Sequence, residues 1–307
     1  MNNNNPSQPA GDNIGFIGLG VMGEPICKHL VVKSGRQVFV NDQDGAPMKR
    51  LEELGAKRIE SSGMAEQVST IFLSLPSGEV VREVLFGDEG IINHLRAGQT
   101  VVDLSTSPVD ITREVAQALR ERGVHFADSP VMRTRSAAEA GTLAVPVGAS
   151  SEIFAEIEPL IAHFASDIRH AGDIGAGQIV KILNNMVLYE TVLALSEAHA
   201  IGRRAGIDPE VLFDAFASGS ADSFALANHG RKAILPQNFP EKAFPVSYAR
   251  KDISYAVQLA EQVGVDACGA RNLIETLDQA IAAGHGDKYA PAISLLFEDD
   301  QPFGNTQ

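Results

Sequence analysis

The chain has 307 residues, of which 44% are hydrophobic and 21% charged, and its net charge at pH 7 is −14. This is the composition of a globular protein with one large domain or two. Its acidity argues against a nucleic-acid partner, and the lack of any apolar run approaching about 18 residues argues against a transmembrane helix or membrane association.

The amino-terminal segment "MNNNNPSQPAGDN" has neither the basic nor the apolar region of a signal peptide, and we expect a disordered leader over residues 1–12. Cys27 and Cys268 are too few for a disulfide framework, which favours a reducing, cytoplasmic location. The 8 histidines are scattered and form no cluster with ligand spacing, so no metal site is indicated.

Short apolar runs alternate with amphipathic stretches in the first half of the chain. The apolar runs predict strands over 14–20, 37–42, 70–76, 100–105, 125–130 and 142–148. Helices are expected over 24–32, 48–55 and 110–123. This alternation predicts an α/β domain of Rossmann type, with a doubly wound parallel sheet and helices on both faces.

The pattern becomes helical after about residue 174. The segment 178–200 is apolar on nearly every face, which predicts one long buried helix. Further helices are expected over 208–218, 248–264 and 271–284. We therefore expect two domains, an α/β domain over 13–174 and an all-helical domain over 175–307, joined at the start of the long helix.

The motif "GLGVMG" follows the first apolar strand and opens a helix, with Gly18, Gly20 and Gly23 in G-x-G-x-x-G spacing. The first glycine permits a tight turn, the second lets the backbone approach a pyrophosphate, and the third allows close helix–strand packing. An ordinary strand–helix turn is the alternative. The motif predicts a dinucleotide site.

Asp42 ends the second predicted strand, 24 residues after Gly18, where a carboxylate can bond both ribose hydroxyls of NAD and repel the 2′-phosphate of NADP. NAD is therefore the expected cofactor. A plain turn or cap residue is the alternative for Asp42, and the nearby Asp44 and Arg36 leave NADP open.

Lys181 interrupts the apolar 178–200 segment, with Asn184 and Asn185 at i+3 and i+4 on the same helix face. A lysine among apolar residues is costly without a partner or a task, and burial lowers a lysine pKa toward the values of ~7–8 that suit proton transfer. Lys181 could thus protonate a carbonyl oxygen as hydride arrives. The alternative is a lysine that extends to the surface beside two capping asparagines.

Four further segments follow the glycine motif along the chain: "LSLPSGEVVREVLFGDEG", "VDLSTSPV", "GAGQIVKILNN" and "ARKDISYA". In this order the motifs resemble those of the β-hydroxyacid dehydrogenase family, and the resemblance covers nearly the whole chain. The resemblance implies an NAD(P)-dependent enzyme that interconverts a small anionic 3-hydroxy acid and its semialdehyde. It implies an NAD-binding domain and a helical domain that binds substrate and forms a homodimer or homotetramer.

The resemblance also assigns roles, position by position. It implies two catalytic residues, Lys181 as the proton donor and acceptor and Asn185, which together with Asn184 orients the substrate. It implies a cofactor site made of Gly18, Leu19, Gly20, Val21, Met22, Gly23, Asp42, Leu75, Pro76, Thr106 and Lys251. It implies a substrate site made of Ser105, Thr106, Met132, Arg133, Thr134, Asn184 and Lys251. For Lys251, a surface lysine paired with a carboxylate is the alternative.

The substrate loop departs from the common family pattern D-A-P-V-S-G-G, because Met132, Arg133 and Thr134 replace its Ser-Gly-Gly. An arginine offers a planar fork for two oxygens, which suits a sulfonate, a phosphate or a second carboxylate. The loop is similar to V-G-R-T-S of the sulfolactaldehyde reductases, with Met132 in place of the glycine and Arg135 in place of the serine. The alternative for Arg133 is a loop arginine that is paired with an acidic neighbour and does not bind the substrate. For Arg135, a role outside substrate binding is favoured.

Two other functions remain as hypotheses. An imine reductase shares this two-domain plan but usually lacks the Lys-x-x-Asn-Asn set. A non-catalytic dinucleotide-binding scaffold would be favoured by loss of the helix lysine, whereas Lys181 is present. Because a fold alone does not establish chemistry, the Lys181 face carries most of the argument for an enzyme.

Overall fold

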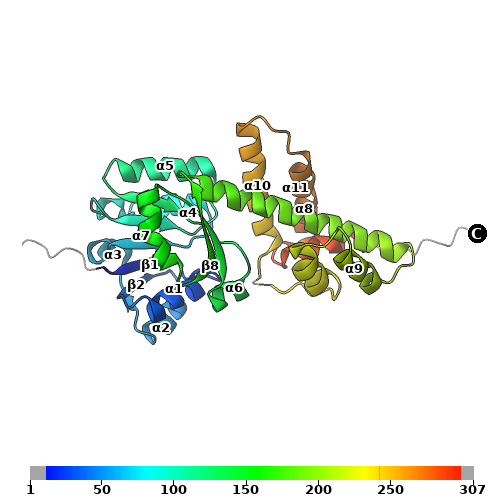
Figure 1. Ribbon diagram of the computed structural model, residues 1–307, viewed down its shortest axis with the longest axis horizontal. Helices are drawn as coiled ribbons and strands as arrows, with labels where there is room; N and C mark the ends of the chain where they lie inside the picture. Colours follow the sequence, from blue (N-terminus) through cyan, green and yellow to red (C-terminus); the bar gives the residue numbers. More distant parts are fainter. Residues whose placement is uncertain (1–11, 242, 299–307) are drawn as a thin grey trace, which may run out of the picture. The chain divides into compact units, whose positions relative to one another are not determined.

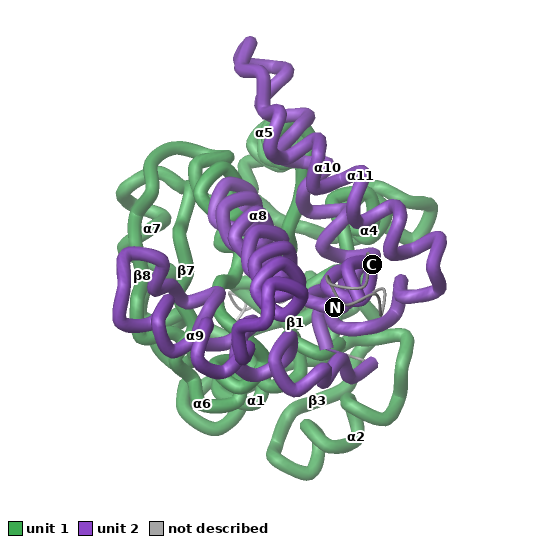
Figure 2. The backbone as a smooth tube through the Cα atoms, turned by 90° about the vertical axis from the view of Figure 1, so that its right-hand side faces the viewer, with its two compact units in different colours: residues 1–181 green, residues 182–307 purple. Residues whose placement is uncertain are grey.

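The computed structural model of the protein describes residues 12–241 and 243–298. Its contacts divide the chain into two compact units, with the division between Lys181 and Ile182. Figure 2 colours the amino-terminal unit green and the carboxy-terminal unit purple. The leader predicted over 1–12 lies outside the described residues, except for Asp12.

The amino-terminal unit is built on one eight-stranded sheet with the strand order β3-β2-β1-β4-β5-β6-β7-β8. Figure 1 labels strands β1, β2 and β8 of this sheet. All predicted strands are present. The strands are β1 Ile14–Ile17, β2 Val38–Asn41, β3 Lys57–Arg58, β4 Thr70–Leu73, β5 Thr100–Asp103, β6 His125–Asp128, β7 Leu143–Gly148 and β8 Ala165–Gly172. The sheet is parallel-dominated rather than parallel throughout, because β6 and β7 pair antiparallel. Two strands were not predicted: β3 has only two residues, and β8 is an edge strand with mostly polar, partly exposed residues.

Seven α-helices precede α8 (Ala176–Arg204) in the described part of the amino-terminal unit, residues 12–181. They are α1 Gly23–Lys33, α2 Gly45–Glu52, α3 Ser61–Gln67, α4 Gly78–Phe86, α5 Val109–Arg120, α6 Arg135–Ala140 and α7 Ser151–Ile161. Helices α1, α2 and α5 were predicted and the other four were not. Two of the missed helices carry a start signal in the sequence, since Ser77 caps α4 and Ser150 caps α7 through their hydroxyl oxygens.

The strands alternate their apolar side chains between two cores, one on each face of the sheet. In β4, for example, Phe72 packs in one core while Ile71 and Leu73 pack in the other. Helices α1, α2, α6 and α7 contribute to the first core, and α3, α4 and α5 to the second. Because both faces of the sheet are covered, strands β1, β4, β5 and β7 are buried along their whole length.

Helix α8, Ala176–Arg204, has 29 residues and runs without interruption across the division between the units. The sequence predicted a helix buried on all sides. The structure corrects this, because Leu183, Val187 and Ile201 are 40%, 60% and 68% exposed. By length and composition α8 could span a membrane. However, 44% of its most apolar 18-residue stretch is buried inside the protein, and the core helix of a soluble protein can have the same length and composition.

The carboxy-terminal unit is helical, as predicted. Its further helices are α9 Pro209–Ser218, α10 Val246–Gln262 and α11 Cys268–Ala280, with π-helical turns at Leu226–Ile234 and Ile281–His285 and a 3₁₀ segment at Ala290–Phe297. Its core gathers residues of α8 with those of α9, α10, α11 and the 290–297 segment, for example Val192, Phe213, Ile253 and Leu273. In the part of the unit that the structure describes, extended pairing is limited to isolated bridges.

Candidate active site

The glycine motif lies between β1 and α1, and each glycine has a separate steric reason. Gly18 has φ +94°, and a Cβ there would lie 2.3 Å from the Ser74 carbonyl oxygen. A Cβ on Gly23 would lie 2.0 Å from the Gly18 carbonyl oxygen. A Cβ on Gly20 would meet nothing within 4 Å. The first and third glycines are thus required by the fold, whereas Gly20 keeps an open surface over the loop.

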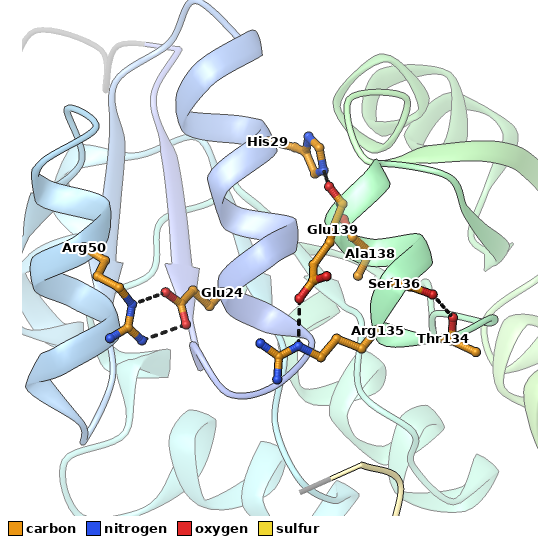
Figure 3. A network of polar contacts seen from close by, with 8 residues as sticks. All are labelled: Glu24, His29, Arg50, Thr134, Arg135, Ser136, Ala138 and Glu139. Atoms are coloured by element: carbon orange, nitrogen blue, oxygen red, sulfur yellow. Dashed lines mark hydrogen bonds and ion pairs between the residues drawn. The ribbon is translucent and has the colours of Figure 1, made fainter. Parts of the chain in front are cut away.

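The start of α1 is suited to an anion. Its N-cap residue Met22 makes no side-chain cap hydrogen bond, in contrast to Asp44 at the start of α2, which accepts from the Ala46 amide. Val21 and Gly20 are exposed, so the end of the helix is accessible. The acidic Glu24 in the first turn is paired with Arg50, whose Nε lies 2.5 Å from Glu24 Oε1 and which lowers the pKa of Glu24 (Figure 3). A pyrophosphate at this helix end would therefore meet the helix dipole without an unpaired carboxylate beside it.

Asp42 follows β2 and contacts the glycine loop directly. One carboxylate oxygen accepts a hydrogen bond from the Leu19 amide, and the other accepts from the Asp44 amide at 2.7 Å. The neighbouring Arg36 is paired with Asp12 at 2.8 Å. The structure thus brings Asp42 and the glycine loop together at the carboxyl ends of β1 and β2, where open α/β sheets bind ligands.

The ends of β4 and β5 form the next part of this edge. The Leu75 amide donates to Ser105 Oγ at 2.9 Å, so the two predicted segments are in contact. Ser105 is buried, Thr106 and Leu75 are half-buried and Pro76 is exposed. The buried carboxylate of Asp103 shapes this loop, because it accepts from the Ser105 amide at 2.9 Å and from Ser107 Oγ at 3.3 Å.

Asp128, at the end of β6, was not singled out from the sequence. It is fully buried and accepts hydrogen bonds from the amides of Gly175 at 2.7 Å and Gln178 at 2.8 Å. Burial raises the pKa of Asp128 to about 7, although the two amide hydrogen bonds oppose the shift. The sequence held only a weak signal for it, an acidic residue at a strand end beside Asp103 in the pairing register.

Lys181 lies in the second turn of α8 and is 8% exposed. Asn184 and Asn185 follow it on the same helix face, and Asn184 Nδ2 donates to Asn185 Oδ1 at 3.2 Å. Asn185 is 3% exposed and Asn184 is exposed. The helix therefore carries a buried ammonium group one turn from two amides, an arrangement that can exchange a proton and orient a carbonyl or carboxylate.

Asp252 on α10 is a second residue that the sequence analysis missed. It is 1% exposed, and its Oδ2 accepts from Asn185 Nδ2 at 2.7 Å. Lys251, next to it, lies with Nζ 3.0 Å from Asp252 Oδ1 and 5.0 Å from the centre of the Tyr255 ring. In the carboxy-terminal unit, therefore, Asn185 and Lys251 share one buried carboxylate, which fixes the orientation of the Asn185 amide.

The substrate loop has an unusual backbone at Arg133, whose φ of +81° is in the region that favours glycine. Its Nη1 donates to the Thr142 carbonyl oxygen at 2.5 Å and to Ser166 Oγ at 3.0 Å. Its Nη2 lies 3.8 Å from Asp167 Oδ2, and both side chains are 38% exposed. The neighbouring Met132 pairs with Ala144, and Thr134 Oγ1 contacts Ser136 Oγ at 2.7 Å. The guanidinium thus lies against the starts of β7 and β8.

Arg135 begins the short helix α6, which was predicted as loop. Its Nε donates to Glu139 Oε1 at 2.9 Å, four residues along the same helix (Figure 3). His29 of α1 contacts the carbonyl oxygens of Ala138 and Glu139 at 3.0 and 3.1 Å, so the end of α6 is held against α1. Arg135 is therefore paired within its own helix.

Two family models together match nearly the whole chain. The family model described as the NAD-binding domain of 6-phosphogluconate dehydrogenase matches residues 13–172. The model described as NAD-binding of NADP-dependent 3-hydroxyisobutyrate dehydrogenase matches residues 175–296. The cofactor is thus NAD(P), and the open Gly20 surface and the uncapped start of α1 fit it.

Full-length relatives are similar. The chain is 32% identical to 2-(hydroxymethyl)glutarate dehydrogenase of Eubacterium barkeri, over 93% of this chain and 94% of that protein. It is 33% identical to 3-hydroxyisobutyrate dehydrogenase of Pseudomonas aeruginosa, over 89% and 95%. The solved structure of Mycobacterium tuberculosis 3-hydroxyisobutyrate dehydrogenase with L-serine is similar with a TM-score of 0.85 and 25% identity, over 94% of this chain and 99% of that one.

The glycine geometry predicts different outcomes for two alanine variants. Gly23→Ala forces a Cβ against the Gly18 carbonyl, so we expect a loss of about 1–3 kcal/mol, as for other overpacked positions, and a lower Tm. Gly20→Ala meets no protein atom, so its Tm should stay close to that of the wild type while its Kd for NADH rises. Thermal unfolding measures the Tm of each variant, and calorimetric titration measures its Kd for NADH. Equal loss of stability in the two variants would contradict the assignment of Gly20 to the ligand.

Proposed function

Because the chain belongs to the β-hydroxyacid dehydrogenase family and is an NAD(P)-dependent 3-hydroxyacid dehydrogenase, we propose that it interconverts a small anionic 3-hydroxy acid and its semialdehyde, with Lys181 as proton donor and acceptor. The observation that carries this proposal is the helix face of Lys181, Asn184 and Asn185, with the lysine only 8% exposed between the apolar residues Val180 and Ile182.

The proposed roles follow from the donor and acceptor groups present. The bound cofactor supplies the hydride chemistry. Lys181 Nζ donates its proton to the carbonyl oxygen during reduction and takes the hydroxyl proton in the reverse direction. Asn185 orients the substrate, and its own amide is oriented by Asp252 through the 2.7 Å hydrogen bond. We propose that Lys251, whose Nζ is paired with the same Asp252 carboxylate, contacts the cofactor or the substrate.

We propose NAD as the preferred cofactor. The Asp42 carboxylate bonds the Leu19 amide and lies where a 2′-phosphate would be repelled. Arg36, the nearby residue that could neutralise such a phosphate, is paired with Asp12. We also propose a cytoplasmic location, which is supported by Cys27 and Cys268 being free thiols.

We propose that the Met132–Thr134 loop binds an anionic group of the substrate that lies away from the reacting carbonyl, which is a sulfonate, a phosphate or a second carboxylate. Arg133 uses Nη1 and Nη2 in its contacts with Thr142, Ser166 and Asp167, which leaves its Nε for a ligand. The dicarboxylate named in the Eubacterium barkeri relative and the V-x-R-T pattern of sulfolactaldehyde reductases both support a loop of this specificity.

The exposed side of α8 supports a homo-oligomer. Leu183, Val187, Ala194 and Ile201 are exposed and recur at intervals of four and seven residues, so they form one apolar stripe along the helix. Apolar stripes of this kind mark protein–protein interfaces. We propose that two copies of the chain pack through this α8 stripe, and that the oligomer is a homodimer or a homotetramer.

An initial-rate screen tests the catalytic assignment. We expect the wild type to reduce one of sulfolactaldehyde, methylmalonate semialdehyde, tartronate semialdehyde or succinic semialdehyde, with NADH preferred over NADPH. Lys181→Ala should lower kcat by at least ~100-fold, the low end for general acid–base catalysis. Lys181→Arg is the matched control, since it keeps the charge but its proton is too tightly held, and it should be equally slow. Both variants should bind NADH as the wild type does, and near-normal turnover of either would remove Lys181 from the mechanism.

Replacement of Arg133 tests whether the loop binds this anionic group. Arg133→Gly removes the guanidinium and suits the φ of +81°, so the loop backbone is not strained. KM for the sulfonated or dicarboxylate substrate should rise by roughly 10- to 100-fold, since a hydrogen bond to a charged group contributes about 1.5–3 kcal/mol. Asp167→Asn is the control, because it removes the ion pair and keeps Arg133. A fall in kcat alone, or an equal effect of Asp167→Asn, would assign Arg133 to the loop structure instead.

Substitution within the α8 stripe tests the oligomer. Val187→Glu places a charge at a 60% exposed apolar position and should shift the chain toward the monomer in light scattering coupled to gel filtration. Val32→Glu on α1, at a 62% exposed position outside the stripe, should leave the mass unchanged. A wild type that is monomeric, or a Val187→Glu protein of unchanged oligomeric mass, would contradict the proposed interface.

A further inference from the structure

The first turn of α8 is held by a carboxylate from the sheet. The N–H groups at the start of a helix have no partners within the helix and must find them elsewhere. Here the amides of Gly175 and Gln178 donate to Asp128 Oδ1 and Oδ2, at 2.7 and 2.8 Å. Asp128 is 47 and 50 residues away in sequence, so this is a tertiary cap between β6 and α8 rather than a local one.

A second link joins the same turn to the loop after β5. Gln178 is fully buried, and its Nε2 donates to the Ser105 carbonyl oxygen at 2.8 Å. Its Oε1 accepts from the Ser107 amide at 3.1 Å. Both ends of one side chain are therefore bonded on either side of Thr106, the residue proposed to contact the nicotinamide and the substrate.

Two glycines make space for this arrangement. A Cβ on Gly148 of β7 would lie 2.4 Å from Asp128 Oδ1. A Cβ on Gly177 of α8 would lie 2.5 Å from the Asp128 carbonyl oxygen. The chain thus lacks side chains where the carboxylate and the helix must approach each other.

We propose that Asp128 and Gln178, together called the α8 anchor, are positioning residues for the proton transfer. Lys181 follows Gln178 by less than one helical turn, so the anchor holds the lysine at a set position relative to the loop of Ser105 and Thr106. This inference rests on the proposed role of Lys181. Catalytic geometry of this kind is sensitive, because a misplacement of about 1 Å costs about 100-fold in rate.

The charge of Asp128 matters for the anchor. Burial raises the pKa of Asp128 to about 7, and repulsion from Asp103 on β5 adds to the shift. Arg113 of α5 lies beside Gly175, and Lys181 follows Gln178 within one turn of α8. The ionised carboxylate accepts from both amides, whereas protonation places a donor against one of them. As the pH falls through about 7, one anchor bond is therefore lost.

The pH dependence of kcat in the direction of reduction separates the effect of Asp128 protonation from the effect of Lys181 protonation. Lys181 acts as an acid in this direction and is protonated at low pH, so its own titration does not lower kcat there. We expect wild-type kcat to fall on the acid side with an apparent pKa near 7. Asp128→Asn should lower kcat by about 10- to 100-fold and abolish this acid limb, with the Kd for NADH little changed.

Gln178→Glu and its matched control complete the test. Gln178→Glu keeps the acceptor for Ser107 but loses the donor to Ser105, so kcat should fall as in Asp128→Asn. Gln99→Glu makes the same change in another buried glutamine, which bonds the Ala65 and Val68 carbonyls at 2.7 and 2.6 Å before β5 begins. Gln99→Glu should lower Tm and leave kcat near the wild-type value.

The outcomes distinguish the anchor from the proposed function. An active wild type with unchanged kcat in Asp128→Asn and Gln178→Glu, or an equal kcat loss in Gln99→Glu, would overturn the positioning role. Hydrogen–deuterium exchange at residues 175–181 gives a readout that needs no substrate, and it should quicken in Asp128→Asn. If the wild type turned over none of the substrates, the proposed function would fail. Independently, hydrogen–deuterium exchange at residues 175–181 that is unchanged in Asp128→Asn would overturn the anchor.

Discussion

The hydrogen bonds from the first turn of α8 to Asp128 are the contact on which the candidate site depends. They join β6, which pairs parallel with β5 and antiparallel with β7, to the helix that carries Lys181. Without a partner from the sheet, the amides at this helix start would be buried and unsatisfied, which costs about 1–3 kcal/mol for each group. The same turn uses Gln178 to reach the loop after β5. One buried carboxylate thus serves both the fold and the site.

The parallel strands explain why the residues of the proposed cofactor site lie at one edge of the sheet. Strands β1, β2, β4 and β5 run in the same direction, so the segments that follow them meet at their carboxyl ends. The glycine loop, Asp42, Leu75 and Ser105 are linked there by the Leu19–Asp42 and Leu75–Ser105 hydrogen bonds. Burial on both faces of the sheet leaves this edge as the place where polar groups can face a ligand.

Electrostatic pairing limits where this acidic chain can bind an anion. Arg50 is paired with Glu24, Arg135 with Glu139 and Arg36 with Asp12. Arg133 is also paired, with Asp167, but its backbone has a positive φ, a conformation that favours glycine. A non-glycine residue in that conformation costs about 1–2 kcal/mol, so the side chain must contribute something to the loop or to its ligand.

The sequence by itself determined the Rossmann-type unit, the glycine loop and the Lys181 helix face, because strand alternation, glycine spacing and helical periodicity are local properties of the chain. It could not determine the partners of that face. Asp128 meets Gly175 across 47 residues and Asp252 meets Asn185 across 67, and no local pattern encodes such pairs. The tertiary structure also decided that one side of α8 is exposed, and that Arg133 lies against β7 and β8, since both depend on which surfaces pack together.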